Sequence, residues 1–449
     1  MSLGLCLIGS MLLDTAVRSA DLMEVYELAK SNDPVFQSAT FAFEAARQKR
    51  SEAFAALLPS VSATADGNRT SGSTAYSGTP AVTRSFYADD WTLQLTQPVV
   101  RPGNVFAYDE ARSFVEAASD EFAAAQQDLM VRVAGAYFDV LVAEETVLAA
   151  DAQLRSMREQ LNAAQSGFQR GVASVTDADD ARSREALAQA QRTAAVANLE
   201  GHRAALEAIT GPVSTPLAGL GASVTLSNPV PDDLGTWVAR SGENNLNVRG
   251  AQATLAAAEH ELSRVRSLRL PSLDLVATYG GNHSSGNVVN PVNYSTDVRD
   301  VTVGLQFSVP IFEGGALSAQ VGEARAKWKK AGADLEAARR QAAQEVKQSY
   351  TAVQSGIAEV AALRAAVDAG SNTVKGAQAG YGLGIRINSD VLNAEQQLYG
   401  TKRDLAKARY DTLLAGLKLK AATGDLRASD LQAMNGLLVE SPTAVPQEH

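Results

Sequence analysis

Three acidic side chains at one expected turn are of a type and spacing that could do chemistry. Asp177, Asp179 and Asp180 lie within four consecutive positions, and carboxylates at this spacing could bind a divalent cation. The same cluster at a helix start would also complement the helix dipole, and both interpretations stay open. The four histidines are scattered and the single cysteine is Cys6, so no metal site is expected from them. No nucleophile and base pattern is present, and we expect neither an enzyme nor a cofactor.

A second turn matches the first. Gly380, Gly382 and Gly384 predict the end of a helix, because glycine adopts the left-handed closing conformation at little cost. Asn388 or Ser389 is expected to cap the helix that follows. Corresponding residues recur at one constant offset: Gly167, Phe168, Gly171, Thr176 and Asp177 match Gly380, Tyr381, Gly384, Ser389 and Asp390. The chain is therefore predicted to be an internal two-fold repeat with matched hairpin tips.

Long helices must position these tips. Two spans, from Pro102 to Pro212 and from Pro310 to Pro442, contain no internal proline, and proline breaks helix interiors. A helix is expected from Gly103 to about Gln165, with a return to Leu206. Its apolar residues step by four and three in a heptad seam, and the second copy repeats the pattern. The seams are Leu129, Val133, Ala136, Val140, Ala143, Val147, Ala150, Leu154, Met157 and Leu161, then Val346, Val353, Val360, Val367 and Val374.

Strands are expected where the period changes to two. Apolar and polar residues alternate in four segments, 61–66, 91–96, 273–279 and 301–309, with polar loops expected at 67–85 and 280–299. Strands of about nine to eleven residues with one apolar face are typical of membrane barrels. Four strands cannot close a barrel, and open edges are not stable in lipid, so three chains with twelve strands are predicted. Trp91, Tyr279 and Phe307 fit either an interfacial girdle or ordinary packing.

The remaining segments set the domain boundaries. Leu3 to Leu13 is apolar and too short to span a bilayer, and a small-residue stretch follows, so residues 1–20 are predicted to be a signal peptide. Repeat 1 is placed at 21–211, beginning with a helix from Leu22 to Leu58. A Pro- and Gly-rich linker at 212–241, repeat 2 at 242–424 and a C-terminal region at 425–449 follow, the last with a helix over Asp430–Leu438. The net charge of -10 without a basic run argues against nucleic acid.

Several motifs together resemble the TolC family of outer-membrane efflux and secretion ducts. The resemblance covers essentially the whole mature length and implies an α+β membrane protein: a trimeric 12-stranded outer-membrane β-barrel, four strands per chain, continued by an α-helical coiled-coil barrel. It also implies a periplasmic adaptor and an inner-membrane ABC or RND transporter as partners, and a Gram-negative outer membrane as location, with most of the chain in the periplasm. The matching stretches are Leu57–Ser60, Gln97–Pro98, Leu206–Gly211, Leu270–Ser272, Val309–Gly315, Gly380–Leu392 and Ala408–Tyr410.

The resemblance assigns a periplasmic gate to the tips. Tyr381 and Arg386 stand where family members carry a tyrosine and an arginine that hold the inner hairpins closed, bonded to residues here represented by Thr176 and Asp177. An arginine–aspartate bond in a crowded ring resists separation and can be replaced by partner contacts. In the alternative interpretation, Thr176 and Asp177 only cap the returning helix and Arg386 is solvated.

One position departs from the family pattern. The acidic ring expected one turn beyond the arginine falls on Asn393, which is neutral, while Asp180 is the equivalent position in repeat 1. The cation-binding ring is therefore absent or shifted to Asp180. The predicted function is an outer-membrane exit duct for type I protein secretion or multidrug efflux, opened by adaptor and transporter docking. The alternative is a non-conducting envelope tether or scaffold.

Overall fold

Four long helices and a four-stranded sheet make up most of the computed structural model, which describes residues 19–171, 174–212, 216–221, 224–289 and 294–439. The helices and strands belong to two compact units. One unit comprises Met1–Thr40, Glu121–Val248 and Arg339–His449, and the other comprises Phe41–Asp120 and Arg249–Ala338. The first 18 residues of the predicted signal peptide lie outside the described residues.

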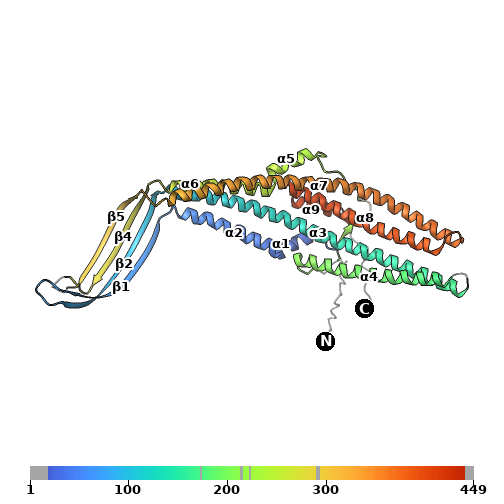
Figure 1. Cartoon of the computed structure of the whole chain (residues 1–449), viewed down its shortest axis with the longest axis horizontal. Coiled ribbons are helices and arrows are strands. Elements are labelled where there is room, and N and C mark those ends of the chain that lie inside the picture. The colour runs from blue at the N-terminus through green and yellow to red at the C-terminus, as the bar shows by residue number, and fades with distance from the viewer. Residues whose placement is uncertain (1–18, 172–173, 213–215, 222–223, 290–293, 440–449) are drawn as a thin grey trace, which may run out of the picture. The chain divides into compact units, whose positions relative to one another are not determined.

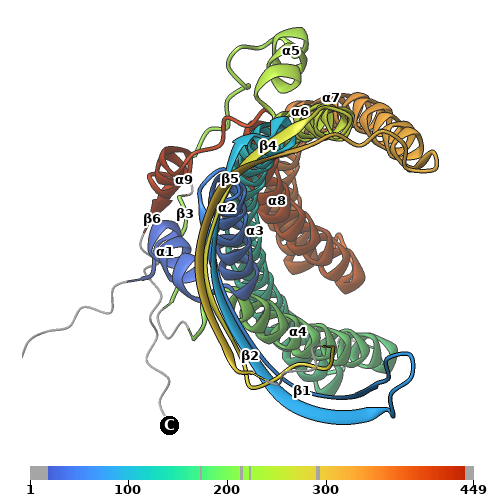
Figure 2. The same cartoon turned by 90° about the vertical axis from the view of Figure 1, so that its left-hand side faces the viewer.

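The sheet of the second unit is antiparallel throughout. Its strands are β1 (Ser60–Thr74), β2 (Val82–Val100), β4 (Ser272–Ser284) and β5 (Thr296–Ser308), in the order β1-β2-β4-β5. Figure 2 shows that this sheet is strongly curved. Twist and curvature of this kind follow from the right-handed twist of each strand. β1 and β5 are the two edge strands.

The register places the alternating apolar residues on one face. Ala63 pairs with Leu93, Leu93 with Tyr279, and Tyr279 with Val301, and directly opposed residues share a face of a sheet. The neighbouring row, in which Leu95 pairs with Ala277, lies on the same face because the side-chain period is two. The four predicted strands and their common apolar face are confirmed.

The connections between paired strands are much shorter than predicted. β1 continues to Thr74 and β2 begins at Val82, so most of the expected polar loop at 67–85 is strand. β4 likewise continues to Ser284, and β5 begins at Thr296. Ladder hydrogen bonds join backbone groups whatever the side chains are, so the strands continue where both faces are polar and the two-residue hydrophobic period has disappeared.

Helix ends support the sheet within the second unit. Its helical part consists of most of α2 (Pro34–Ala55), the start of α3 (Pro102–Gln169), most of α6 (Leu246–Ser267) and the start of α7 (Ala316–Gly382). The Gln97 amide donates to the Leu57 carbonyl oxygen at 3.1 Å, and the Arg101 guanidinium pairs with the buried Asp274 carboxylate at 2.7 Å. These bonds tie the ends of the strands to the ends of the helices.

In the first unit, α3 and α7 continue as long helices and are joined by α4 (Val175–Thr210) and α8 (Asn388–Ala422). Gly356 allows close approach of α7 and α8, because a side chain there would collide with Thr412. The predicted seams are largely buried, which confirms the heptad interpretation. Fully or nearly buried seam residues are Leu129, Val133, Val140, Ala143, Leu154 and Met157 on α3, and Val346, Val353, Val360 and Val374 on α7.

Short elements pack around the middle of this unit. They are α1 (Leu22–Asn32), β3 (Gly219–Leu220), α5 (Leu234–Asn244), α9 (Ala428–Asn435) and β6 (Leu438–Val439). β3 and β6 pair with each other. The core contains residues of α1, α3, α8 and α9, and α9 begins two residues before the predicted start.

The first predicted helix is divided in two at Asp33. Because Asp33 precedes Pro34, the helical conformation is disfavoured there, and Asp33 adopts extended angles, φ -67° and ψ 115°. Its carboxylate then accepts from the Phe36 amide at 3.0 Å and pairs with Arg132 at 2.7 Å. The single helix predicted over Leu22–Leu58 is therefore wrong at this position.

Candidate gate at the hairpin tips

Two turns lie at the same end of the first unit (Figure 1), and the predicted gate residues are next to them. Thr176 and Asp177 are in the first turn of α4. Tyr381 is in the last turn of α7, and Arg386 lies between α7 and α8.

One turn joins α3 to α4 and the other joins α7 to α8. Both contain a glycine with positive φ, Gly171 at 71° and Gly384 at 74°, a conformation that other residues rarely adopt. Gly171 and Gly384 are therefore required by the backbone. Gly380 and Gly382 do not end the helix as predicted, because α7 continues through both of them to Gly382.

Asp177 is engaged within its own turn. Ser174 is the N-cap of α4, and its hydroxyl oxygen accepts from the Asp177 amide at 3.1 Å while the Asp177 carboxylate accepts from the Ser174 amide at 3.0 Å. The Ser174 hydroxyl and amide hold the pKa of Asp177 below its usual value. Thr176 is exposed, and its hydroxyl lies 2.6 Å from the Ser174 hydroxyl. Asp177 thus contributes to a capping box in the single chain.

Tyr381 and Arg386 are exposed at the other tip. The Arg386 side chain lies over Gly380, where an added Cβ would be 3.1 Å from Arg386 Cγ. The Ile385 and Arg386 amides both donate to the Gly380 carbonyl oxygen, at 2.9 and 3.2 Å. Across the described part of the chain, neither Tyr381 nor Arg386 forms a hydrogen bond or ion pair with Thr176 or Asp177. The gate bonds therefore remain a prediction for the assembled protein.

The cap predicted for α8 is wrong. The N-cap is Ile387, which makes no side-chain capping bond. α8 begins at Asn388, so neither Asn388 nor Ser389 is its N-cap. An apolar N-cap leaves the first amide groups of α8 without a side-chain acceptor. The two tips therefore differ: α4 begins with a complete capping box, and α8 begins without one.

Arg184 joins the two residues predicted for an ion ring. Its Nε donates to Asp180 Oδ2 at 3.1 Å, and its Nη1 donates to Asn393 Oδ1 at 2.8 Å. Asp179 pairs with Arg182 at 2.7 Å. Each member of the acidic cluster therefore has a partner in the single chain. Among the described residues, no group of three or more His, Cys, Asp or Glu is arranged to hold a metal ion.

Below the tips, Glu395 is a buried carboxylate that no sequence pattern had indicated. It is only 3% exposed and accepts a hydrogen bond from the Gln378 amide at 2.9 Å and another from the Ser156 hydroxyl. In the same region Leu392 packs with Leu154, Met157 and Ala188 in one apolar cluster. Glu395 lies in a polar run, Asn393 to Gln397, and only its place on the helical face that bears Leu392 could have indicated burial.

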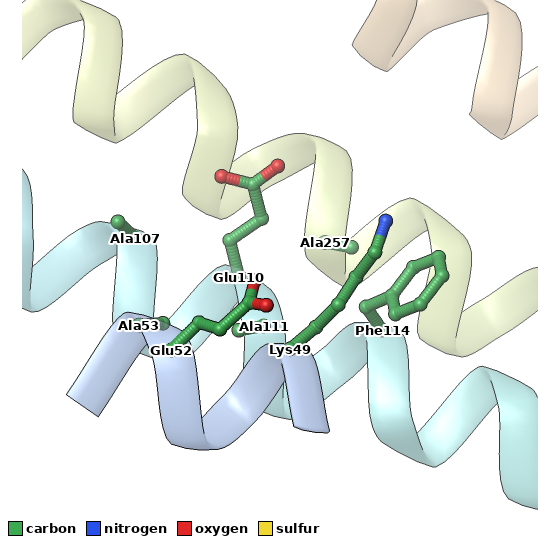
Figure 3. A pocket seen from close by; sticks show the side chains of 8 residues that line it. All are labelled: Lys49, Glu52, Ala53, Ala107, Glu110, Ala111, Phe114 and Ala257. Carbon is green, nitrogen blue, oxygen red and sulfur yellow. The ribbon is translucent and has the colours of Figure 1, made fainter. Parts of the chain in front are cut away.

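The second unit contains a hollow of about 470 Å³ between α2, α3 and α6 (Figure 3). Four of the lining residues are alanines, whose short side chains leave the space open. The Lys49 Nζ lies over the Phe114 ring, 4.9 Å from the ring centroid. Glu110 lines the hollow. Burial and the neighbouring Glu261 carboxylate raise the pKa of Glu110 from 4.5 to about 7, while Arg264 opposes the rise. The hollow contains no nucleophile and base pair.

Solved structures with this fold are outer-membrane channels. The Campylobacter jejuni CmeC outer membrane channel matches with a TM-score of 0.78 at 19% sequence identity, over 93% of this chain and 89% of that chain. At such identity the likeness shows the fold alone. No helix in the described ranges is both long and apolar enough to cross a bilayer. The fold is therefore that of the TolC-like outer-membrane channels.

The chain belongs to the outer membrane efflux protein family, whose sequence model matches residues 25–212 and 237–425. It is 31% identical to the alkaline protease secretion protein AprF of Pseudomonas aeruginosa, over 94% of this chain and 88% of that protein. It is 29% identical to the outer membrane protein TolC of Escherichia coli, over 96% and 87% respectively. The resemblance to the TolC family is confirmed. By family the chain is an outer-membrane export protein, and its relatives are named as secretion, efflux and outer membrane proteins.

Proposed function

We propose that three copies of this chain form the exit duct of a tripartite export system, with a closed 12-stranded barrel in the outer membrane. The observation that carries the proposal is the apolar face of the sheet, which is open to solvent in the single chain: Leu305 and Phe307 are each 67% exposed. A sheet in a soluble protein would not leave such an apolar face uncovered. The outside of a membrane barrel, in contrast, must be apolar where it contacts lipid.

The sheet edges support closure by further copies of the chain. The outer edges of β1 and β5 have no partner strand in the described chain. Pairing β1 of one copy with β5 of the next removes both edges, which lipid requires. The alternating stretch from Val301 to Val309 has the length that a tilted strand needs to cross a membrane, about nine to eleven residues. A tether without conduction needs no such sheet.

The order of elements supports a two-fold repeat. Helix, two strands, long helix, tip and returning helix occur as α2-β1-β2-α3-α4 and again as α6-β4-β5-α7-α8. Three chains then contribute six similar helical hairpins, which suit a closed tube of helices in the periplasm. Ile311 and Phe312, 94% and 86% exposed between β5 and α7, are apolar side chains that a neighbouring chain or lipid would cover.

The tips act as the gate in this proposal. Tyr381 and Arg386 of one hairpin close against Thr176 and Asp177, within the trimer, and docking of a periplasmic adaptor and an inner-membrane transporter separates them. Asp177 keeps its capping box, because a carboxylate has enough lone pairs to accept from Arg386 as well. The 31% identity to a protease secretion protein favours type I protein secretion as the export process.

The mass of the detergent-purified protein gives the number of chains in the assembly and so tests the proposed trimer. Native mass spectrometry is expected to give three chains, because that number supplies twelve strands. A monomer that remains folded and soluble without detergent would contradict the proposal, since its apolar sheet face would then be stable in water.

A further inference from the structure

Two helical hairpins meet along a seam below the tips in the first unit. The first hairpin is α3 with α4, and the second is α7 with α8. Leu392 of α8 packs against Leu154 and Met157 of α3 and Ala188 of α4. Beside this cluster the Glu395 carboxylate of α8 is buried. Within the described part of the chain no lysine, arginine or histidine pairs with it, and its two donors, Ser156 and Gln378, are neutral.

The two donors belong to different hairpins. Gln378 lies on α7, in the same hairpin as Glu395, whereas Ser156 lies on α3 in the other hairpin. If the hairpins separate, the Ser156 bond must break, but the Gln378 bond can persist. Separation also returns the carboxylate to water. Only neutral donors hold the charge of the buried carboxylate, and on separation the carboxylate regains the hydration that burial had removed.

We propose that Glu395 is a positioning residue that keeps the seam between the two hairpins releasable, with its buried charge opposing closure and its Ser156 bond favouring closure. The inference rests on the proposed function, in which export requires the hairpins to separate. It concerns a contact apart from Tyr381, Arg386, Thr176 and Asp177.

The two partners of this one hydrogen bond therefore have opposite effects. Ser156→Ala removes a donor and leaves the carboxylate buried with one bond, which is costly, so the closed state is weakened. Glu395→Gln removes the charge and can keep both bonds: its carbonyl oxygen accepts from Gln378, and its amide donates to the Ser156 oxygen. The closed state is then strengthened.

The experiment measures the open probability of the purified full-length protein in planar bilayers. All variants are made in an Arg386→Ser background, which is expected to open partly. Ser156→Ala is expected to raise open probability and Glu395→Gln to lower it, each by about fivefold or more. Ser166→Ala and Glu159→Gln, exposed residues on the same helix α3, are the matched controls and should change little. Circular dichroism and native mass verify folding and assembly of every variant.

Each result decides something. Opposite shifts in the two variants support the inference, because a merely structural contact would weaken closure in both. Shifts of the same sign, or no shift in either, overturn it while leaving the duct intact. A folded and inserted background protein that does not conduct at all contradicts the proposed function, and the inference with it.

Discussion

Arg184 sets the charge that the first tip presents. Its guanidinium neutralises Asp180 and also binds Asn393 on the neighbouring hairpin. The sequence identified Asp180 and Asn393 as the ring positions, but it did not indicate their common partner. Arg184 and Asn393 are far apart in the chain, and local spacing carries no information about a bond between helices of different hairpins. The geometry favours the absent-ring version of the hypothesis.

Removal of Arg184 should therefore create a cation site. Wild-type channels are expected to resist block by multivalent cations, because the Asp180 charge is compensated. Arg184→Ala leaves three unpaired carboxylates in a trimer and should lower the blocking concentration of hexamminecobalt by roughly tenfold, from charge attraction alone. The measurement is current block in a planar bilayer.

Arg184→Ala combined with Asp180→Asn is the control and should restore resistance. Wild-type channels that are already blocked as strongly as Arg184→Ala would show that the arginine does not compensate the ring position. Block of the wild type that also survives Asp180→Asn would exclude a ring shifted to Asp180.

Glu110 should make stability depend on pH. Its pKa is raised to about 7 by burial and by Glu261, so the folded chain binds this proton more tightly than the unfolded chain does. Its contribution to stability is complete below the ordinary value of 4.5 and is lost as the pH rises through about 7. Glu110→Gln removes this dependence, and its melting temperature at about pH 8 should exceed the wild-type value by a few degrees.

Melting curves of the purified protein by circular dichroism, recorded between about pH 5 and pH 8, measure the effect. Glu52→Gln changes an exposed carboxylate lining the same hollow and should leave the slope as in the wild type. An equally steep decline in Glu110→Gln would rule out Glu110 as the source of the pH dependence.

At the scale of elements, the repeating patterns were readable and the boundaries were not. Proline-free spans and heptads predicted that two long helices exist, and they placed the ends of α3 within four residues. Two-residue alternation predicted which residues share the apolar sheet face. The extension of β1 and β2 beyond the apolar stretch was not predictable, because backbone pairing continues where the side chains carry no period. The break at Asp33 could have been read from Pro34.

The two faces of β5 provide an element-scale prediction. Leu305 lies on the apolar face and Gln306 on the opposite face, one residue apart and both exposed in the single chain. Leu305→Lys should destabilise the inserted barrel by about 2–4 kcal/mol per chain, if the residue faces the middle of the lipid. Gln306→Lys adds the same charge to the interior face and should be tolerated.

The two variants are compared by the yield of folded, heat-resistant trimer in outer-membrane fractions. Equal tolerance of both lysines would mean that the apolar face does not contact lipid, and the orientation of the sheet would have to be reversed or abandoned.

At the scale of the whole molecule, the chain has the fold of outer-membrane channels, and in our proposal three copies assemble with the gate at their tips. The first tip uses Asp177 for its own cap, and in a single chain Arg386 makes no bond to it. A gate that needs several chains cannot be read from one chain, because its bonds form only when the hairpins are assembled in a ring. The open apolar sheet face and the unpaired β1 and β5 edges are the features that make assembly necessary.

Single-channel conductance of the purified protein in a planar bilayer tests the central claim most directly. Wild type is expected to show a small conductance, because the tips are closed, and Arg386→Ser with Tyr381→Phe is expected to raise it several-fold. An equal conductance in the two proteins would keep the duct and reject the gate assignment. No conductance in either, from a folded and membrane-inserted trimer, would contradict the duct itself.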